Sequence, residues 1–91
     1  MTKAELRKKA NDVLINRSLE KRFIFVQNDK NSFITVDGKS VTEISIDMEQ
    51  GIIWLGDSCI IPYKKIGYKT DEQALQFYGE LLDAWILAVT N

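Results

Sequence analysis

Between residues 70 and 91, apolar side chains recur with the period of an α-helix and cover an unusually large part of its circumference. At ~100° per residue they spread over an arc of roughly 200°, whereas an ordinary amphipathic helix has an apolar stripe of about 100° or somewhat more. Thr70 and Gln73 have the spacing of a capping box, which predicts that the helix begins here. The segment is therefore predicted to form one long helix that buries more than one side.

The faces of this helix differ in composition. Its apolar arc divides into a centre and two flanks, with Tyr78, Leu81 and Trp85 at the centre, Phe77, Ala84 and Ala88 on one flank, and Leu75, Leu82 and Ile86 on the other. The clearly polar strip consists of Glu72, Gln76, Gly79, Glu80 and Asp83. One face of a sheet can cover the centre and one flank, so the remaining flank needs a second helix or another molecule as cover.

A second capping box, Thr2 with Glu5, predicts another helix that begins at Lys3. Its apolar residues form one narrow stripe, and we expect it to end near Asn16. The pattern from Asn16 to Glu20 fits either a turn or a frayed extra helical turn. The apolar stripe consists of Leu6, Ala10, Val13 and Leu14.

Between the two helices, β-branched and aromatic runs favour strands. Asp37-Gly38 has the composition of a tight hairpin turn, and Glu49 to Gly51 is a second turn. Pro62 ends the last run because proline cannot donate to a strand ladder. Tyr63 to Lys69 is predicted to be a basic, aromatic connection to the long helix. The expected strands cover residues 23–26, 33–36, 42–48, 52–55 and 58–61.

This order of elements predicts a single α+β domain over residues 1–91. It has an N-terminal helix, a five-stranded antiparallel β-meander, and a long C-terminal helix packed on one sheet face. Small residues on the helix flank allow close approach of a second helix, so we also expect a homodimer through the C-terminal helix. The candidates for self-association are Phe77, Leu81, Ala84 and Ala88.

Composition narrows the setting in which the protein works. The 91 residues are 45% hydrophobic, with no apolar run near the ~20 residues that a membrane span requires. Residues 1–20 are charged and amphipathic and do not resemble a signal peptide. Cys59 is the single cysteine and lies in an apolar run, where a buried thiol behaves as a small hydrophobe. We therefore expect a cytoplasmic protein with no contact to a membrane.

The charge is unevenly distributed along the chain, although the net charge is only −1. Residues 1–22 carry seven basic and three acidic side chains, whereas residues 70–91 carry four acids and no base. This asymmetry can steer a partner, or it can draw the two ends of the chain together.

The sequence offers little for catalysis. It contains no histidine, which removes the commonest general base and metal ligand, and it lacks a glycine-rich phosphate loop. We expect no cofactor, no metal and no catalytic residues. A hydrolase that uses Asp47, Glu49 and Asp57 with a divalent ion is a third hypothesis, ranked last, because these carboxylates fit the polar side of a strand and a turn.

Nucleic-acid binding is the stronger alternative. Tyr63 and Tyr68 interleave the last of three basic clusters and can stack on bases. The pI of about 5.3 argues against a dedicated phosphate binder. The clusters are Arg7, Lys8 and Lys9; Arg17, Lys21 and Arg22; and Lys64, Lys65 and Lys69.

The first hypothesis is a non-enzymatic protein-interaction module that acts by stoichiometric binding of a larger macromolecule, most often a protein. Inhibitors, adaptors and the anti-defence proteins of phages and mobile elements have this profile. An aromatic or basic anchor surrounded by polar loops would make the contact. The candidates for partner binding are Tyr63, Lys64, Lys65, Tyr68, Asp29, Lys30 and Glu49.

Overall fold

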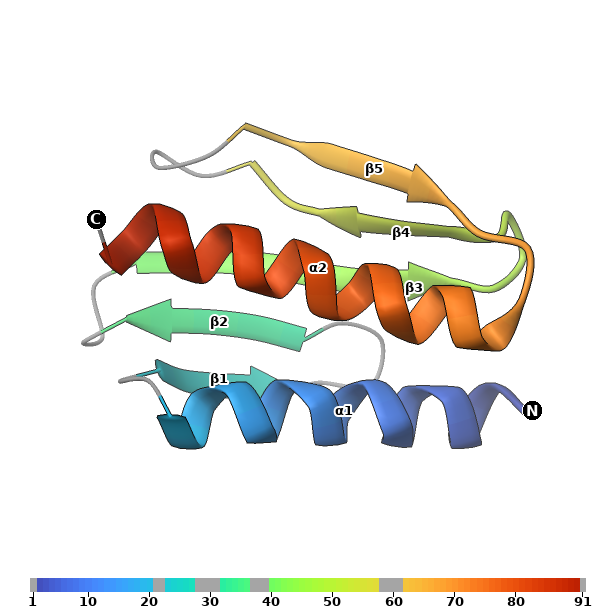
Figure 1. The fold of residues 1–91 in the computed structure, drawn as a ribbon, viewed down its shortest axis with the longest axis horizontal. Helices are drawn as coiled ribbons and strands as arrows, with labels where there is room; N and C mark the ends of the chain where they lie inside the picture. Colours follow the sequence, from blue (N-terminus) through green and yellow to red (C-terminus); the bar gives the residue numbers. More distant parts are fainter. Residues whose placement is uncertain (1, 21–22, 28–31, 37–39, 58–61, 91) are drawn as a thin grey trace.

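Two helices and an antiparallel sheet make up the computed structural model, which describes residues 2–20, 23–27, 32–36, 40–57 and 62–90. The strands pair in sequence order, β1-β2-β3-β4-β5, and every pair is antiparallel (Figure 1). The α+β class with an antiparallel sheet is therefore confirmed. The elements are α1 (Lys3–Glu20), β1 (Phe23–Gln27), β2 (Ser32–Val36), β3 (Ser40–Asp47), β4 (Ile52–Leu55), β5 (Lys64–Gly67) and α2 (Asp71–Thr90).

Both helices begin where their capping residues predict. The Thr2 hydroxyl accepts a hydrogen bond from the Glu5 backbone N–H at 3.2 Å, and the Thr70 hydroxyl accepts one from the Gln73 N–H at 3.2 Å. The Gln73 side chain accepts its hydrogen bond from the N–H of Lys69, one residue before the cap, at 2.9 Å. In both helices the cap thus satisfies a backbone donor that the first turn leaves free.

The stretch from Asn16 to Glu20, which the sequence left open between a turn and an extra helical turn, is helical. α1 continues past Asn16 to Glu20, because the intervening residues include no glycine or proline to stop it. The extra turn brings Arg17 to α2, where its Nε lies 2.8 Å from Oδ1 of Asp83. This ion pair joins the basic N-terminal region to the acidic C-terminal one.

The sheet differs from the prediction at its last strand. Residues 64–67 form β5, although Tyr63 to Lys69 was predicted to be a connection. Ile66 is the only large apolar residue of β5 and lies opposite Ile53 of β4, which is sufficient for an edge strand. The strand predicted at 58–61, which contains Cys59, and the Asp37-Gly38 turn lie outside the described residues.

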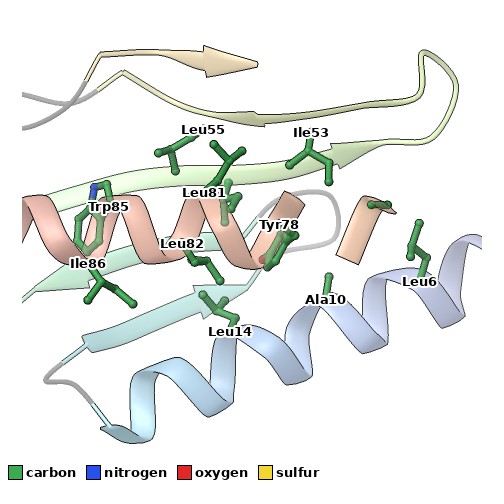
Figure 2. Close-up of a cluster of buried hydrophobic side chains, with 12 residues drawn as sticks. Leu6, Ala10, Leu14, Ile53, Leu55, Tyr78, Leu81, Leu82, Trp85 and Ile86 are labelled. Carbon is green, nitrogen blue, oxygen red and sulfur yellow. The ribbon is translucent and has the colours of Figure 1, made fainter. Parts of the chain in front are cut away.

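The core lies between the helices and one face of the sheet. In β4 the side chains alternate, with Ile53 and Leu55 fully buried and Ile52 and Trp54 half-buried. Figure 2 shows Leu6, Ala10 and Leu14 of α1 directed toward α2, with Ile53 and Leu55 of β4 on the other side of α2 in this view. The buried apolar residues are Leu6, Ala10 and Leu14 of α1, Ile44, Ile53 and Leu55 of the sheet, and Ala74, Tyr78, Leu81, Leu82, Trp85 and Ile86 of α2.

The two helices approach each other closely at Gly79. This glycine is buried, although its spacing assigned it to the polar strip of α2. A Cβ at this position would lie 3.6 Å from a guanidinium nitrogen of Arg17 and 3.8 Å from a methyl group of Val13. α1 therefore packs against α2 on the side of Gly79, next to the flank that carries the buried Leu82 and Ile86, whereas the flank of Phe77, Ala84 and Ala88 stays half-buried.

Candidate functional site

One face of the sheet is not covered by either helix. Side chains alternate across a strand, so Trp54 lies on the face opposite to the buried Ile53 and Leu55. The register places Ser45 of β3 and Lys65 of β5 opposite Trp54 on this same face. We call it the open face of the sheet.

An aromatic pair occupies the open face near its β5 edge. The rings of Trp54 and Tyr63 are stacked, with their centroids 6.4 Å apart and their planes at 29°. Tyr63 is nevertheless 52% exposed, although it is one of the larger apolar side chains of the protein. Two side chains that hold each other in this way form an ordered apolar platform accessible to solvent.

Two lysines follow Tyr63 along β5, Lys65 on the open face and Lys64 on the opposite face. Lys64 and Lys65 are exposed on β5, and no ion pair joins either of them to an acid within the part of the chain that the structure describes. We define the Trp54 surface as Trp54, Tyr63 and Lys65 on the open face together with Lys64, which is exposed at the adjoining edge on the opposite face of β5. It combines aromatic area with two lysines that form no ion pair to another described residue.

The structure brings some of the predicted partner-binding residues together and separates others. Tyr63, Lys64 and Lys65 lie within the Trp54 surface, whereas Tyr68 and Glu49 lie at the other end of the β4–β5 pair. Glu49 is exposed, and its carboxylate lies 3.9 Å from the Lys3 ammonium group. Asp29 and Lys30 lie outside the described residues.

Tyr68 is held against the turn between β3 and β4. Its backbone N–H donates a hydrogen bond to the carbonyl oxygen of Gly51 at 2.8 Å, and its side chain packs partly against the core. Burial raises the pKa of the Tyr68 phenol above its ordinary value of 10.0, and the negative charges of Asp71 and Asp47 raise it further. Tyr68 therefore keeps a neutral phenol beside Asp71 and Asp47, which is consistent with a role in the fold.

The three carboxylates of the hydrolase hypothesis have different surroundings. Oδ1 of Asp47 accepts hydrogen bonds from the N–H groups of Glu49 at 3.0 Å and Gln50 at 3.2 Å, which stabilise the turn. Asp57 is exposed after β4. Among the described residues, no group of three or more histidine, cysteine or acidic side chains is arranged to hold a metal ion.

The basic clusters are likewise separated by the fold. Arg17 is paired with Asp83, and the neighbours Lys8 and Lys9 are exposed on α1. Lys21 and Arg22 lie outside the described residues. Lys64 and Lys65 lie next to Tyr63 at one end of β5, whereas Lys69 is exposed beyond Tyr68 at the other end.

The residues predicted to mediate self-association are largely used within the chain. Leu81 is only 3% exposed and belongs to the core, so it offers no surface to a second molecule. Phe77, Ala84 and Ala88 are half-buried, and Phe77 and Ala88 pack against the same core.

Trp54 is the functional candidate that the sequence did not identify. It lies in the nearly continuous apolar run of β4, where periodicity cannot show which side chains face the core. Its exposure follows from the register of β4, and its contact with Tyr63 depends on how the chain returns to form β5. The signal that could have indicated Trp54 is a tryptophan within a short predicted strand near the edge of the sheet.

Comparisons with protein-family models, with curated proteins and with solved structures find no match to this chain. Neither helix in the described ranges combines the length and the apolar composition needed to cross a membrane. The geometry of the Trp54 surface is therefore the observation on which a functional proposal can be built.

Proposed function

We propose that the protein is a binding module that acts stoichiometrically on a larger protein, and that the Trp54 surface makes the contact. One observation carries this proposal: Trp54 and Tyr63 are stacked on a sheet face that neither helix covers, and Tyr63 is still 52% exposed. An exposed aromatic pair of this kind has the composition of an interface anchor.

The stacking also lowers the cost of binding. A side chain that is immobilised at an interface loses roughly 0.5–1.5 kcal/mol of rotamer freedom, and part of this loss is already incurred when two rings hold each other in the free protein. Lys64 and Lys65 supply a polar rim and can steer an acidic partner toward the aromatic rings. In this proposal, the five-stranded meander with α2 on one face serves as a rigid support for the opposite face.

The proposal assigns inhibitor or adaptor activity in the cytoplasm and needs no homodimer. The sequence suggested self-association because one flank of α2 lacked a cover. α1 of the same chain covers the flank at Gly79, with Leu82 1% and Ile86 8% exposed. The other flank, which carries Phe77, Ala84 and Ala88, is half-buried and is the part of α2 that supports a homodimer.

Affinity capture from a cell lysate tests the proposal. We expect the wild-type protein to recover a protein partner in near-stoichiometric yield and Tyr63→Ala to recover much less, because the substitution removes half of the aromatic platform without entering the core. Lys8→Ala, an exposed change on α1, is the matched control and should capture as the wild type does. Equal recovery by Tyr63→Ala and the wild type would contradict the proposal.

A second candidate function, binding of single-stranded nucleic acid, is favoured by the exposed Lys65 on the face of the aromatic pair and by the neighbouring exposed Lys64. Base–aromatic stacking contributes about 1–3 kcal/mol per base, and lysines neutralise the phosphates. Binding of this kind weakens steeply as salt rises. A mobility-shift titration at low and high salt, with Lys64→Glu/Lys65→Glu as the comparison, separates this function from protein binding.

A further inference from the structure

The outer edge of β5 has backbone groups that no other described strand uses. Within the described ranges β5 is the last strand of the sheet and pairs with β4 alone. In an antiparallel pair, residues that exchange backbone hydrogen bonds alternate with residues that do not. The Tyr68 N–H bond to the Gly51 carbonyl identifies Gly51 and Tyr68 as a bonded pair, one position beyond Ile52 and Gly67.

This alternation fixes which groups of β5 point outward. Counting back from Tyr68, Ile66 and Lys64 also bond to β4, whereas Gly67 and Lys65 do not. The N–H and C=O groups of Lys65 and Gly67 therefore face away from β4. They present two donors and two acceptors, in register, along the edge.

The charge on this edge is positive at one end and acidic at the other. Lys64 and Lys65 are both exposed, and their side chains leave the strand on opposite faces of the sheet. The Tyr68 end lies near Asp71 and Asp47, whose charges act on the Tyr68 phenol. Lysines on an edge strand oppose pairing with a like-charged strand, so a second copy of β5 is a poor occupant.

We propose that an extended, acidic segment of the partner protein adds to β5 as a further strand, with adjacent acidic residues opposite Lys64 and Lys65. This inference rests on the proposed function and specifies how the partner is held. Backbone hydrogen bonds to Lys65 and Gly67 provide affinity, and the two lysines select for acidic residues on both faces of the added strand. A segment in this position passes beside Tyr63, which comes directly before β5 and stacks on Trp54, so the partner reaches the aromatic pair through Tyr63.

The inference is tested by titrating the full chain with a synthetic peptide and following the backbone amide signals by NMR. The probe is Thr-Val-Glu-Glu-Val-Thr with blocked ends, and the comparison peptide has lysines in place of the glutamates. We expect the acidic peptide to shift the amide signals of Lys65 and Gly67 more than those of Ile66 and Lys64. The basic peptide should bind about tenfold more weakly or worse, since it places like charges side by side.

A matched pair of variants isolates the backbone contact. Gly67→Pro removes an outward N–H without breaking a bond to β4, so the acidic peptide should bind about tenfold more weakly. Gly67→Ala keeps this N–H, and its Cβ would lie an ordinary 3.9 Å from the Gly51 carbonyl oxygen, so it should bind as the wild type does. If Gly67→Pro does not fold, the acidic peptide is N-methylated at alternate residues instead. The pattern that removes the peptide N–H groups facing β5 should abolish binding, whereas the pattern that removes the N–H groups facing away should not.

The possible outcomes separate this inference from the proposed function. Unchanged binding of the acidic peptide to a folded Gly67→Pro, or equal binding of both peptides, would overturn strand addition. An oligothymidylate that displaces the peptide and shifts the same amides more strongly would overturn it in favour of nucleic acid. If Tyr63→Ala fails to capture the partner and Gly67→Pro still captures it, strand addition is wrong and the proposed function stands. If both variants capture the partner as the wild type does, the proposed function itself is wrong.

Discussion

Gly51 makes the turn between β3 and β4 possible. Its φ of 66° lies in the left-handed region, where any side chain other than hydrogen is strained. A Cβ there would also lie 3.3 Å from the carbonyl oxygen of Tyr68, in a contact that the neighbour would have to relieve. Position 51 therefore favours glycine for two reasons: the backbone has a positive φ, and the Tyr68 carbonyl oxygen leaves little space for a side chain.

Gly51→Ala is expected to lower the free energy of unfolding by about 1–2 kcal/mol, because the left-handed conformation costs about that much for an L-residue. Urea denaturation measures the change. Gly67→Ala is the control, since its added Cβ meets only an ordinary contact and should change stability by less than about 1 kcal/mol. Equal effects of the two substitutions would show that the turn is not the source of the strain.

Tyr68 is predicted to make the fold sensitive to alkali. Its pKa is raised in the folded protein, first by burial and then by Asp71 and Asp47, so the fold favours the neutral phenol. This contribution to stability is fully present below the ordinary value of 10.0 and is lost as pH rises through the higher pKa of the folded state. Tyr68→Phe should remove this loss in urea denaturation curves recorded across alkaline pH.

The charge at Asp47 offers a more specific check on the same group. Asp47→Asn keeps the side-chain oxygen that accepts hydrogen bonds from Glu49 and Gln50, but it removes one of the negative charges that act on Tyr68. The pKa of Tyr68 should therefore fall in this variant, as followed by the ultraviolet absorbance of tyrosinate. An unchanged titration would mean that Asp47 does not act on the phenol.

At the scale of elements, the contact between α1 and α2 depends on a glycine in the middle of a helix. Gly79 lies against Arg17 and Val13, and the nearest atom to an added Cβ is 3.6 Å away. One methyl group therefore fits, whereas a larger side chain does not. The neighbouring Arg17–Asp83 ion pair is largely solvent-exposed on the Asp83 side and contributes at most about 1 kcal/mol.

Gly79→Ala is expected to stabilise the protein by up to about 1 kcal/mol, because alanine has the better helix propensity and its Cβ meets only ordinary contacts. Gly79→Leu should destabilise it by about 1–3 kcal/mol, since it forces the helices apart. Thermal unfolding of both variants provides the measurement. A destabilising alanine would show that α1 lies closer to α2 than the structure describes.

The elements also show what sequence patterns can and cannot predict. Thr2 and Thr70 marked both helix starts, because a cap is a local interaction between residues three apart. β5 was missed because Ile66 is its only large apolar residue, so its strand character comes from pairing with β4. The Trp54 surface was only half predicted for the same reason: Tyr63 and the lysines are visible in the sequence, but their position beside Trp54 depends on long-range register.

At the scale of the whole molecule, most of the wide apolar arc of α2 is covered within one chain, and the flank of Phe77, Ala84 and Ala88 stays half-buried. The sheet covers its centre, and α1 covers the flank at Gly79. The face of the sheet opposite to the helices is left open, and it carries the aromatic pair. The molecule thus divides into a helical side that stabilises the fold and a sheet side that is available to a partner.

This division predicts a monomer. Light scattering coupled to size exclusion should give the mass of one chain, 10.4 kDa, across the concentration range. A concentration-dependent rise toward twice this mass would contradict the prediction. Phe77→Ser would then test whether the half-buried flank of α2 forms the contact.

Site-specific photocrosslinking tests the central claim, that the Trp54 surface holds a protein partner. A photoreactive phenylalanine analogue is placed at Tyr63 in one variant and at Gln76, on the exposed side of α2, in another. Irradiation in the cell should join a single protein species to the chain from position 63 and leave position 76 without an adduct. An adduct from position 76 with none from position 63 would contradict the account.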